Sequence, residues 1–471
     1  MSGEDNRNDW RVYFALGAAV IVGCYLRLRN VEVNGLWLDE VFSVTASDPD
    51  NNFFDVYKRT LSDVHPPAYQ ILLWMFYKVF GYAEMTGRYL SVFFGVLLVP
   101  AIFYLGRQLF DQRVGLFSAG LAAINFYLVS YSQETRSYSL LAFLVVLSFI
   151  FFIIALRRST IFNVGVYAVV VAIMVNTHYF GFLPAAAQLI LFFLFNGKES
   201  FQKKLILKFF MAAVFVILTL VPSALYILNA LARKGTWVPV PNDQFFVEMF
   251  SLYFGSLSLS IIAAILIVFG LADLIKKEDK RKSLQIIVVW VSVCVVVPYI
   301  RSLYYPPVLT MRNLIVVLPA ILVVLGYGLN LVRERVVLIA IVLVVFCFSM
   351  TPLFTSVKPA YTLENQFHPK SQMRDVVRVM AGKCSGCSVY SYLPFEFKGY
   401  AKVLGLQLNV KGFDEVEDDL ESAVQPFDFF ILSTRGIARP DTDYMKKHGF
   451  HMIKEIPLGD SSLDEYRSDP R

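Results

Sequence analysis

Long stretches without Asp, Glu, Lys or Arg dominate the first three quarters of the chain. A membrane-spanning helix needs about 20 largely apolar residues. Ten stretches reach or approach this length: 12–26, 89–106, 114–133, 137–156, 159–197, 209–232, 249–272, 283–300, 313–332 and 336–357. The stretch 159–197 is long enough for two spans and is interrupted by His178, Gly181 and Pro184. The pattern therefore predicts about eleven spans, the first of them a retained helix.

One apolar segment, residues 66–77, is too short to cross a bilayer and is typical of a helix on the membrane surface. The charges of the loops decide its placement. If 66–77 does not cross and the N-terminus is inside, most Lys and Arg residues between spans fall on the cytoplasmic side. A crossing would reverse every later loop and violate the positive-inside rule. We therefore expect residues 30–88 to form one long outer loop of a multi-pass protein in the cytoplasmic (inner or plasma) membrane.

The pattern changes near residue 355, where short apolar strands begin to alternate with helix-like segments. The predicted strands are 387–392, 406–410, 427–432 and 452–456, and the predicted helices are 371–382, 394–404, 415–424 and 442–449. The sequence thus predicts an all-α polytopic membrane module, residues 1–354. A small soluble α/β domain, residues 355–471, follows on the extracytoplasmic side.

Composition supports this division. The chain of 471 residues is 56% hydrophobic and only 17% charged, which excludes a soluble globular enzyme. Its net charge of +6 follows from basic loops, so we expect no nucleic-acid partner. Five cysteines do not form a disulfide framework, although Cys384 and Cys387 could pair across a turn. A redox or zinc role for this pair lacks the required helix or further ligands.

The outer loops carry the candidate chemistry, because charged groups at a membrane boundary are costly and usually functional. In the first loop, Trp37 is a natural interfacial anchor for Asp39 and Glu40. Partial desolvation at that depth would raise the pKa of a carboxylate and make it a better base. The alternative is a solvated acidic pair that caps the next helix.

Two further segments lie on the same predicted side. Pro66 and Pro67 fix the direction of His65 and Tyr69, or they simply start a helix. The turn Gln133-Glu-Thr-Arg136 joins two spans, and its Arg136 either binds a lipid phosphate or pairs locally with Glu134.

Later outer loops add fewer signals. Arg312 is a second candidate phosphate ligand, whereas Arg301 is better explained as a topological anchor. His178 is more simply a satisfied polar residue than a ligand. The segment 233–241 combines a glycine with two prolines and would suit a flap over a site.

Together these motifs resemble the polytopic glycosyltransferases of the C-type fold, in particular bacterial enzymes similar to protein O-mannosyltransferases and the lipid A aminoarabinose transferase. The resemblance covers about residues 10–355 and is densest over 36–156. Its motifs are Leu36-Trp-Leu-Asp-Glu40, His65-Pro-Pro-Ala-Tyr69, Gly87-Arg-Tyr-Leu-Ser91, Gly106-Arg-Gln-Leu-Phe110 and Tyr131-Ser-Gln-Glu-Thr-Arg136.

The resemblance implies a sugar donor carried on a polyisoprenyl phosphate, with membrane lipids around it. By this resemblance Asp39 is the catalytic base and Glu40 assists it. The implied ligands of the donor phosphate are Arg136, Arg312, His65 and Tyr69, supported by Trp37, Gln133, Glu134 and His178. Relatives of the aminoarabinose type carry Lys where His65 stands.

A divalent metal lies near the phosphate in some members of this group. Here His65, His178, Glu40 and Glu134 are scattered along the chain, so no cofactor is assigned and metal dependence is left open.

The predicted function is inverting transfer of a sugar from a polyisoprenyl-phosphate donor to a hydroxyl or phosphate of an acceptor lipid, glycan or protein. The main alternative is a transporter or flippase of lipid-linked sugars, and a third is a catalytically silent scaffold. Transporters usually show repeated halves and polar, interrupted helices at the midplane. Here the charges gather at the outer boundary, which favours the transferase.

Overall fold

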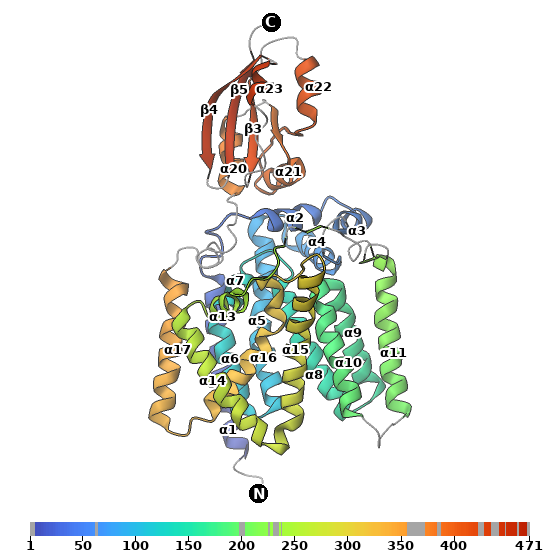
Figure 1. Cartoon of the computed structure of the whole chain (residues 1–471), viewed down its shortest axis with the longest axis vertical. Helices are drawn as coiled ribbons and strands as arrows, with labels where there is room; N and C mark the ends of the chain where they lie inside the picture. Colours follow the sequence, from blue (N-terminus) through green and yellow to red (C-terminus); the bar gives the residue numbers. More distant parts are fainter. Residues whose placement is uncertain are drawn as a thin grey trace.

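The computed structural model describes two parts, a helical module and a domain built on a β-sheet at one end of it (Figure 1). The described residues are 5–61, 65–196, 203–224, 227–228, 235–236, 238–355, 373–383, 388–422, 428–434, 442–447, 449–458 and 461–468. The cysteines of the predicted disulfide, Cys384 and Cys387, lie outside them.

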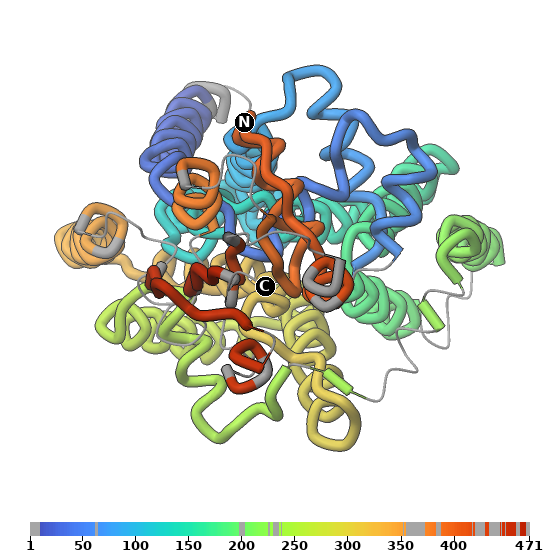
Figure 2. The backbone as a smooth tube through the Cα atoms, turned by 90° about the horizontal axis from the view of Figure 1, so that it is seen from above, coloured from blue at the N-terminus to red at the C-terminus, as the bar shows by residue number. Residues whose placement is uncertain are grey.

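Apolar helices of different lengths form the module. They are α1 (Asp5–Leu28), α5 (Glu84–Leu109), α6 (Gln112–Ile124), α7 (Phe126–Ser132), α8 (Tyr138–Arg157), α9 (Ile161–Thr177), α10 (Phe182–Phe195), α11 (Lys203–Leu220), α13 (Phe245–Phe254), α14 (Leu257–Lys276), α15 (Arg281–Tyr304), α16 (Leu318–Asn330) and α17 (Arg335–Thr355). Short 3₁₀ helices are η1 (Tyr179–Gly181), η2 (Val221–Ser223), η3 (Glu278–Lys280) and η4 (Met311–Val316). Figure 2 shows α11 and α17 at opposite edges of the bundle.

Every stretch predicted to span the membrane coincides with one or two of these helices. In the described chain, six helices are long and apolar enough to cross, or seven if the bent pair α6 and α7 counts as one span. Shorter apolar helices include α9, α10, α13, α16 and most of α17. The all-α membrane fold is thus confirmed, whereas the number of eleven spans stays a prediction.

The bend of 57° between α6 and α7 has a local cause. Asn125 ends α6 in an extended conformation and caps α7, because its side chain accepts a hydrogen bond from the Leu128 N–H at 2.9 Å. The same amide donates to the carbonyl of Tyr253 at 2.9 Å. This bend places the turn that carries Arg136 beside the other outer segments.

Three short helices cover the end of the bundle that faces the sheet domain: α2 (Leu38–Ala46), α3 (Phe53–Leu61) and α4 (Ala68–Phe80) (Figure 1). The predicted surface segment 66–77 falls in α4. This helix buries Tyr69, Leu73 and Tyr77 against the bundle and exposes Phe80 on its other side. Such a helix packs along the bundle end, as expected for an interfacial segment.

The second part is a small α/β domain. It contains α20 (Met373–Lys383), α21 (Pro394–Val403), α22 (Glu415–Ser422) and α23 (Thr442–Lys447), with β1 (Ser388–Ser391), β2 (Val410–Gly412), β3 (Asp428–Thr434), β4 (Phe450–Leu458) and β5 (Ser461–Ser468). The strand order is β2-β1-β3-β5-β4. The pairs of β1 with β2 and β3 are parallel, and those of β5 with β3 and β4 are antiparallel.

The strand β5 was not predicted from the sequence pattern. Its residues are mostly polar, yet the strand lies inside the sheet and buries Leu463 and Tyr466. Tyr466 stacks on Phe429 of β3 with ring centroids 5.5 Å apart. Pairing on both edges, which a local pattern cannot reveal, stabilises this strand.

The placement of α4 predicts the membrane topology. A reporter fused after Arg113 should read cytoplasmic and one fused after Phe54 should read extracytoplasmic, because the two sites lie at opposite ends of the bundle. Alkaline phosphatase and green fluorescent protein fusions measure this. An external signal at Arg113 would show that α4 crosses the membrane.

Candidate active site

Asp39 and Glu40 lie in the first turn of α2, where the partial positive charge of a helix N-terminus stabilises carboxylates. Consecutive residues of a helix point about 100° apart. The two side chains consequently enter different environments. Glu40 is fully buried, whereas the side chain of Asp39 is 28% exposed.

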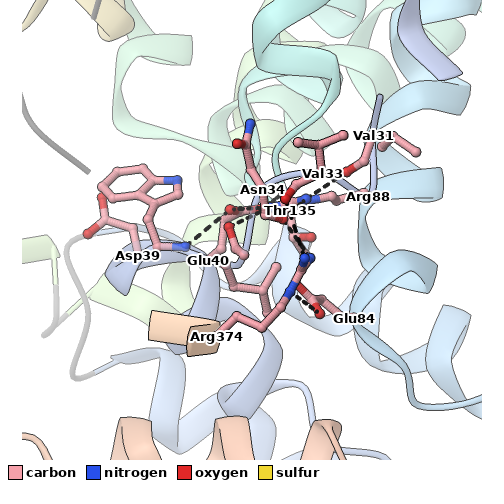
Figure 3. A network of polar contacts seen from close by, with 12 residues as sticks. Val31, Val33, Asn34, Asp39, Glu40, Glu84, Arg88, Thr135 and Arg374 are labelled. Atoms are coloured by element: carbon pink, nitrogen blue, oxygen red, sulfur yellow. Dashed lines mark hydrogen bonds and ion pairs between the residues drawn. The ribbon is translucent and has the colours of Figure 1, made fainter. Parts of the chain in front are cut away.

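Glu40 forms a buried ion pair with Arg88 of α5 (Figure 3). Arg88 Nε donates to Oε1 at 3.1 Å and Nη2 donates to Oε2 at 3.0 Å. The backbone N–H of Thr135 donates to Oε1 at 2.7 Å, and that of Trp37 donates to Oε2 at 3.3 Å. Glu40 is thereby held in the core and does not line the cavity described below. This placement suits assistance to Asp39 by position, and the expected catalytic role of Glu40 stays a prediction.

The remaining donors of Arg88 hold the loop before α2. Nη1 donates to the carbonyls of Val31 at 2.7 Å and Asn34 at 2.6 Å, and Nη2 donates to that of Gly35 at 2.9 Å. All five guanidinium N–H groups are therefore used. The start of α2 is fixed relative to α5 and to the turn that contains Thr135.

Two arginines converge on Asp39. Arg312 of η4 donates from Nη1 to Asp39 Oδ2 at 2.9 Å. Arg136, in the turn between α7 and α8, donates from Nη1 to the backbone carbonyl of Asp39 at 2.9 Å and to Ser43 Oγ at 2.8 Å. The Arg312 guanidinium also lies 5.3 Å from the ring centroid of Trp37, a cation–π contact.

Asp39 and both arginines line a cavity of about 700 Å³ at the end of the bundle. His65 and His178 line it as well, together with the loop before η4. Glu396 of α21 brings a carboxylate from the α/β domain to the same cavity. Residues that are distant in the sequence thus form one site.

His65 and His178 pack with their ring centroids 4.3 Å apart. His178 Nδ1 accepts the Phe180 N–H at 3.0 Å, so a neutral His178 carries its proton on Nε2. Burial, reinforced by Arg136 and Arg312, lowers the pKa of His178 to about 3. Burial, followed by His178 and the same arginines, lowers the pKa of His65 well below its usual range. Both imidazoles are neutral at pH 7, so they can donate or accept hydrogen bonds but add no charge.

The other predicted residues surround the site without lining it. Tyr69 is buried with its hydroxyl 3.3 Å from Ser91 Oγ, and burial raises its pKa. Trp37 is only 4% exposed, so it packs beneath Arg312 instead of anchoring at an interface. Gln133 donates to the carbonyls of Arg27 at 3.2 Å and Arg29 at 2.7 Å, at the end of α1. Glu134 is buried beside Thr135.

The contacts of Arg88 and the position of Glu396 in the cavity were not predicted from the sequence. The available signal for Arg88 was a charged residue at the start of an apolar span. For Glu396 no local signal existed. Arg301, expected to be an anchor, lines the cavity and donates to the carbonyl of Pro306 at 2.6 Å.

A divalent metal does not fit this arrangement. In the part of the chain that the structure describes, no group of three or more His, Cys, Asp or Glu side chains could hold a metal ion. Glu40 is occupied by Arg88, and two arginines flank Asp39. Guanidinium groups already place positive charge beside Asp39.

Comparison with known proteins identifies the fold. The sequence model of a family described as dolichyl-phosphate-mannose-protein mannosyltransferase matches residues 64–226. Among curated protein sequences none matches significantly.

Solved structures match more of the chain than the family model does. ArnT from Cupriavidus metallidurans in the apo state is 13% identical, with 99% of this chain and 100% of that one covered and a TM-score of 0.62. The arabinofuranosyltransferase AftD from Mycobacteria is 12% identical over 98% of this chain and 40% of that one, with a TM-score of 0.58. The archaeal oligosaccharyltransferase AglB from Archaeoglobus fulgidus is 12% identical over 92% of this chain and 70% of that one, with a TM-score of 0.56.

The predicted C-type glycosyltransferase fold is therefore confirmed. The family model matches residues 64–226, and the similarity to the solved structures is one of fold.

The Glu40–Arg88 pair predicts that Glu40 contributes more to the free energy of unfolding than its neighbour Asp39. Glu40→Gln should lower the free energy of unfolding by about 3–5 kcal/mol, because it leaves a buried guanidinium without its counter-charge. Asp39→Asn breaks a partly exposed pair and should cost less than about 1 kcal/mol. Thermal denaturation in detergent compares the two variants. Equal losses would contradict the assignment of Glu40 to the core.

The buried His178 predicts a pH dependence of stability. Its pKa is about 3 in the folded chain and about 6.5 when unfolded, so the unfolded chain binds the extra proton between these values. Stability should consequently fall as the pH drops below about 6.5. His178→Asn, whose Oδ1 can still accept the Phe180 N–H, should reduce the fall in melting temperature between about pH 8 and pH 5. His451→Asn, an exposed histidine of β4, is the control. An unchanged fall in His178→Asn would count against this assignment.

Proposed function

We propose that this protein transfers a sugar from a polyisoprenyl-phosphate donor to an acceptor hydroxyl or phosphate at the outer face of the cytoplasmic membrane. The observation that carries the proposal is the convergence of Asp39, Arg136 and Arg312 on one cavity at the end of an apolar bundle. The cavity offers a carboxylate that can act as a base and two permanent cations that can bind a phosphate.

Two of the similar structures support a lipid-phosphate donor. ArnT from Cupriavidus metallidurans was solved bound to undecaprenyl phosphate, and its TM-score with this chain is 0.61. AglB from Archaeoglobus fulgidus was solved with a dolichol-phosphate. A lipid of this type stays in the bilayer, because each buried methylene contributes about 0.8 kcal/mol. The site must therefore lie where the lipid phosphate meets water.

The proposed mechanism is a single displacement. Asp39 accepts the proton of the acceptor hydroxyl. At the same time the oxygen of that hydroxyl attacks the anomeric carbon of the donor sugar. The bond between that carbon and the phosphate oxygen breaks on the opposite face, so the configuration is inverted. The electron pair leaves with the lipid phosphate, and Asp39 then releases its proton to solvent.

Arg136 and Arg312 act on the leaving group. Their attraction to the phosphate increases as negative charge develops on it, which lowers the barrier. Arg312 is paired with Asp39 in the structure described here. A donor phosphate competes for this guanidinium and draws it away from the carboxylate. Donor binding would in this way leave Asp39 available to accept a proton.

The acceptor would approach from the side of the α/β domain. Glu396 lies there, and its carboxylate repels a phosphate whereas the arginines attract one. Burial raises the pKa of Glu396. Its carboxylate oxygens can accept a hydrogen bond from an acceptor hydroxyl.

The transporter alternative is less well supported. A transporter holds its substrate near the bilayer midplane, at interrupted helices. The cavity is instead lined by Asp39 and Arg312 at the end of the bundle and by Glu396 of the α/β domain.

Asp39→Asn should lower the rate of sugar transfer by at least about a hundredfold, because it removes the base but keeps the size of the side chain. Undecaprenyl phosphate should still bind to this variant and raise its melting temperature. Arg136→Ala should differ from it in weakening the binding of undecaprenyl phosphate. Unchanged transfer by Asp39→Asn would exclude it as the base.

Transfer can be followed without knowing the substrates. Membranes from a strain that lacks the gene supply the native donor and acceptor, and each variant is returned to them. Mass spectrometry of envelope lipids and glycoproteins then identifies the product that is lost with the gene and measures its recovery.

A further inference from the structure

The loop before α2, residues 31–35, is held from two sides. Arg88 of the bundle binds the carbonyls of Val31, Asn34 and Gly35. Arg374 of α20, in the α/β domain, approaches from the other side (Figure 3). It donates to the carbonyls of Glu32 at 3.0 Å, Val33 at 3.4 Å and Asn34 at 2.7 Å. Every carbonyl of this loop thus accepts a hydrogen bond from one of two arginines.

Arg374 is itself fixed by Glu84 at the start of α5. Its Nη2 donates to Glu84 Oε1 at 2.6 Å, and its Nε lies 3.1 Å from both carboxylate oxygens. Tyr400 of α21 donates its hydroxyl proton to Glu84 Oε1 at 3.0 Å and accepts the Leu36 N–H at 2.7 Å. The α/β domain therefore contacts the chain up to three residues before Asp39.

The α/β domain packs closely against the loop before α2 and against α2 itself. A Cβ atom at Gly35 would lie 2.7 Å from Cβ of Arg374, so a glycine is required for this approach. On the other side of α2, a Cβ atom at Gly399 would lie 2.1 Å from Thr45 Oγ1. Both ends of α2 are packed against the α/β domain.

We propose that Arg374 is a positioning residue for Asp39, so that the α/β domain is a structural part of the active site. The inference rests on the proposed function and extends it to a second domain. Asp39 must stay within reach of the acceptor hydroxyl that attacks the donor, and a misplacement of about 1 Å can cost about a hundredfold in rate. The loop that Arg374 immobilises leads directly into the turn that carries Asp39.

Arg374 could instead only hold the α/β domain against the bundle. Another ion pair of the same interface provides a matched control for this alternative. Lys402 of α21 forms ion pairs with Asp48 at 2.5 Å and Asp50 at 2.7 Å, beyond the other end of α2. Its removal weakens the same domain interface without touching residues 31–36. If Arg374 only docked the domain, Lys402→Ala and Arg374→Ala would have similar effects.

The experiment compares Arg374→Ala, Arg374→Lys, Glu84→Gln, Lys402→Ala and Asp39→Asn in the full-length protein. The first readout is product formation in membranes from the strain that lacks the gene. We expect a loss of about a hundredfold for Arg374→Ala, partial rescue in Arg374→Lys and an intermediate loss in Glu84→Gln, which keeps the carbonyl contacts. Lys402→Ala should stay close to the wild type.

The second readout is hydrogen exchange of the backbone amides of residues 31–40. Arg374→Ala should speed exchange there, and Lys402→Ala should not, because only the former frees the loop. Binding of undecaprenyl phosphate should be retained by Arg374→Ala, which shows that the chain is folded and that Arg136 and Arg312 are in place.

The outcomes separate the two proposals. Product retained by Asp39→Asn would overturn the proposed function. Product lost in Asp39→Asn but retained in Arg374→Ala would overturn only the positioning role. Equal losses and equal exchange in Arg374→Ala and Lys402→Ala would also overturn it, in favour of simple docking.

Discussion

The buried ion pair between Glu40 and Arg88 is the interaction on which the rest of the site depends. Removing two charges from water costs several kcal/mol for each ion, and mutual attraction offsets this only when the remaining hydrogen-bonding capacity is also satisfied. Here the guanidinium uses all its donors and the carboxylate also accepts two backbone N–H groups. One geometry satisfies these groups together. That geometry connects α5, the loop before α2, and the turn before α8.

This constraint gives two adjacent carboxylates different roles. Glu40 gives rigidity because it is inaccessible, and Asp39 is available to a substrate because its neighbour holds the backbone. Arg136 and Arg312 also have different roles, one at the backbone and one at the carboxylate. Arg136 binds the backbone and Ser43 of α2 while it lines the cavity, whereas Arg312 binds the carboxylate of Asp39 itself. A donor phosphate can displace the contact between Arg312 and Asp39 without loosening the contacts of Arg136.

Much of the architecture follows from local pattern. Apolar length located the membrane helices, and alternation located β1, β3 and β4. The predicted strand 406–410 meets β2 only at Val410, and the surface position of α4 stays a prediction from loop charge. The outer loops carrying Asp39, His65, Arg136 and Arg312 were also expected to meet, and they line one cavity. What could not be predicted depends on partners distant in the sequence. Nothing near Glu40 indicates that Arg88 will neutralise it, and nothing near Arg374 indicates that it reaches the carbonyls of residues 32–34. The polar strand β5 is stabilised by its two neighbours in the same way.

The chemistry proposed here explains why the site is assembled from so many segments. A polyisoprenyl chain keeps the donor phosphate at the bilayer surface, whereas the acceptor arrives from water, so neither a bundle interior nor a soluble domain could bind both. The cavity takes cations from the end of the bundle and Glu396 from the α/β domain, as a site shared by these two environments would require. Loops at such a boundary lack the packing that makes a helix rigid. The hydrogen bonds of Arg88 and Arg374 supply that rigidity by fixing the backbone itself, which leaves the side chain of Asp39 available for reaction.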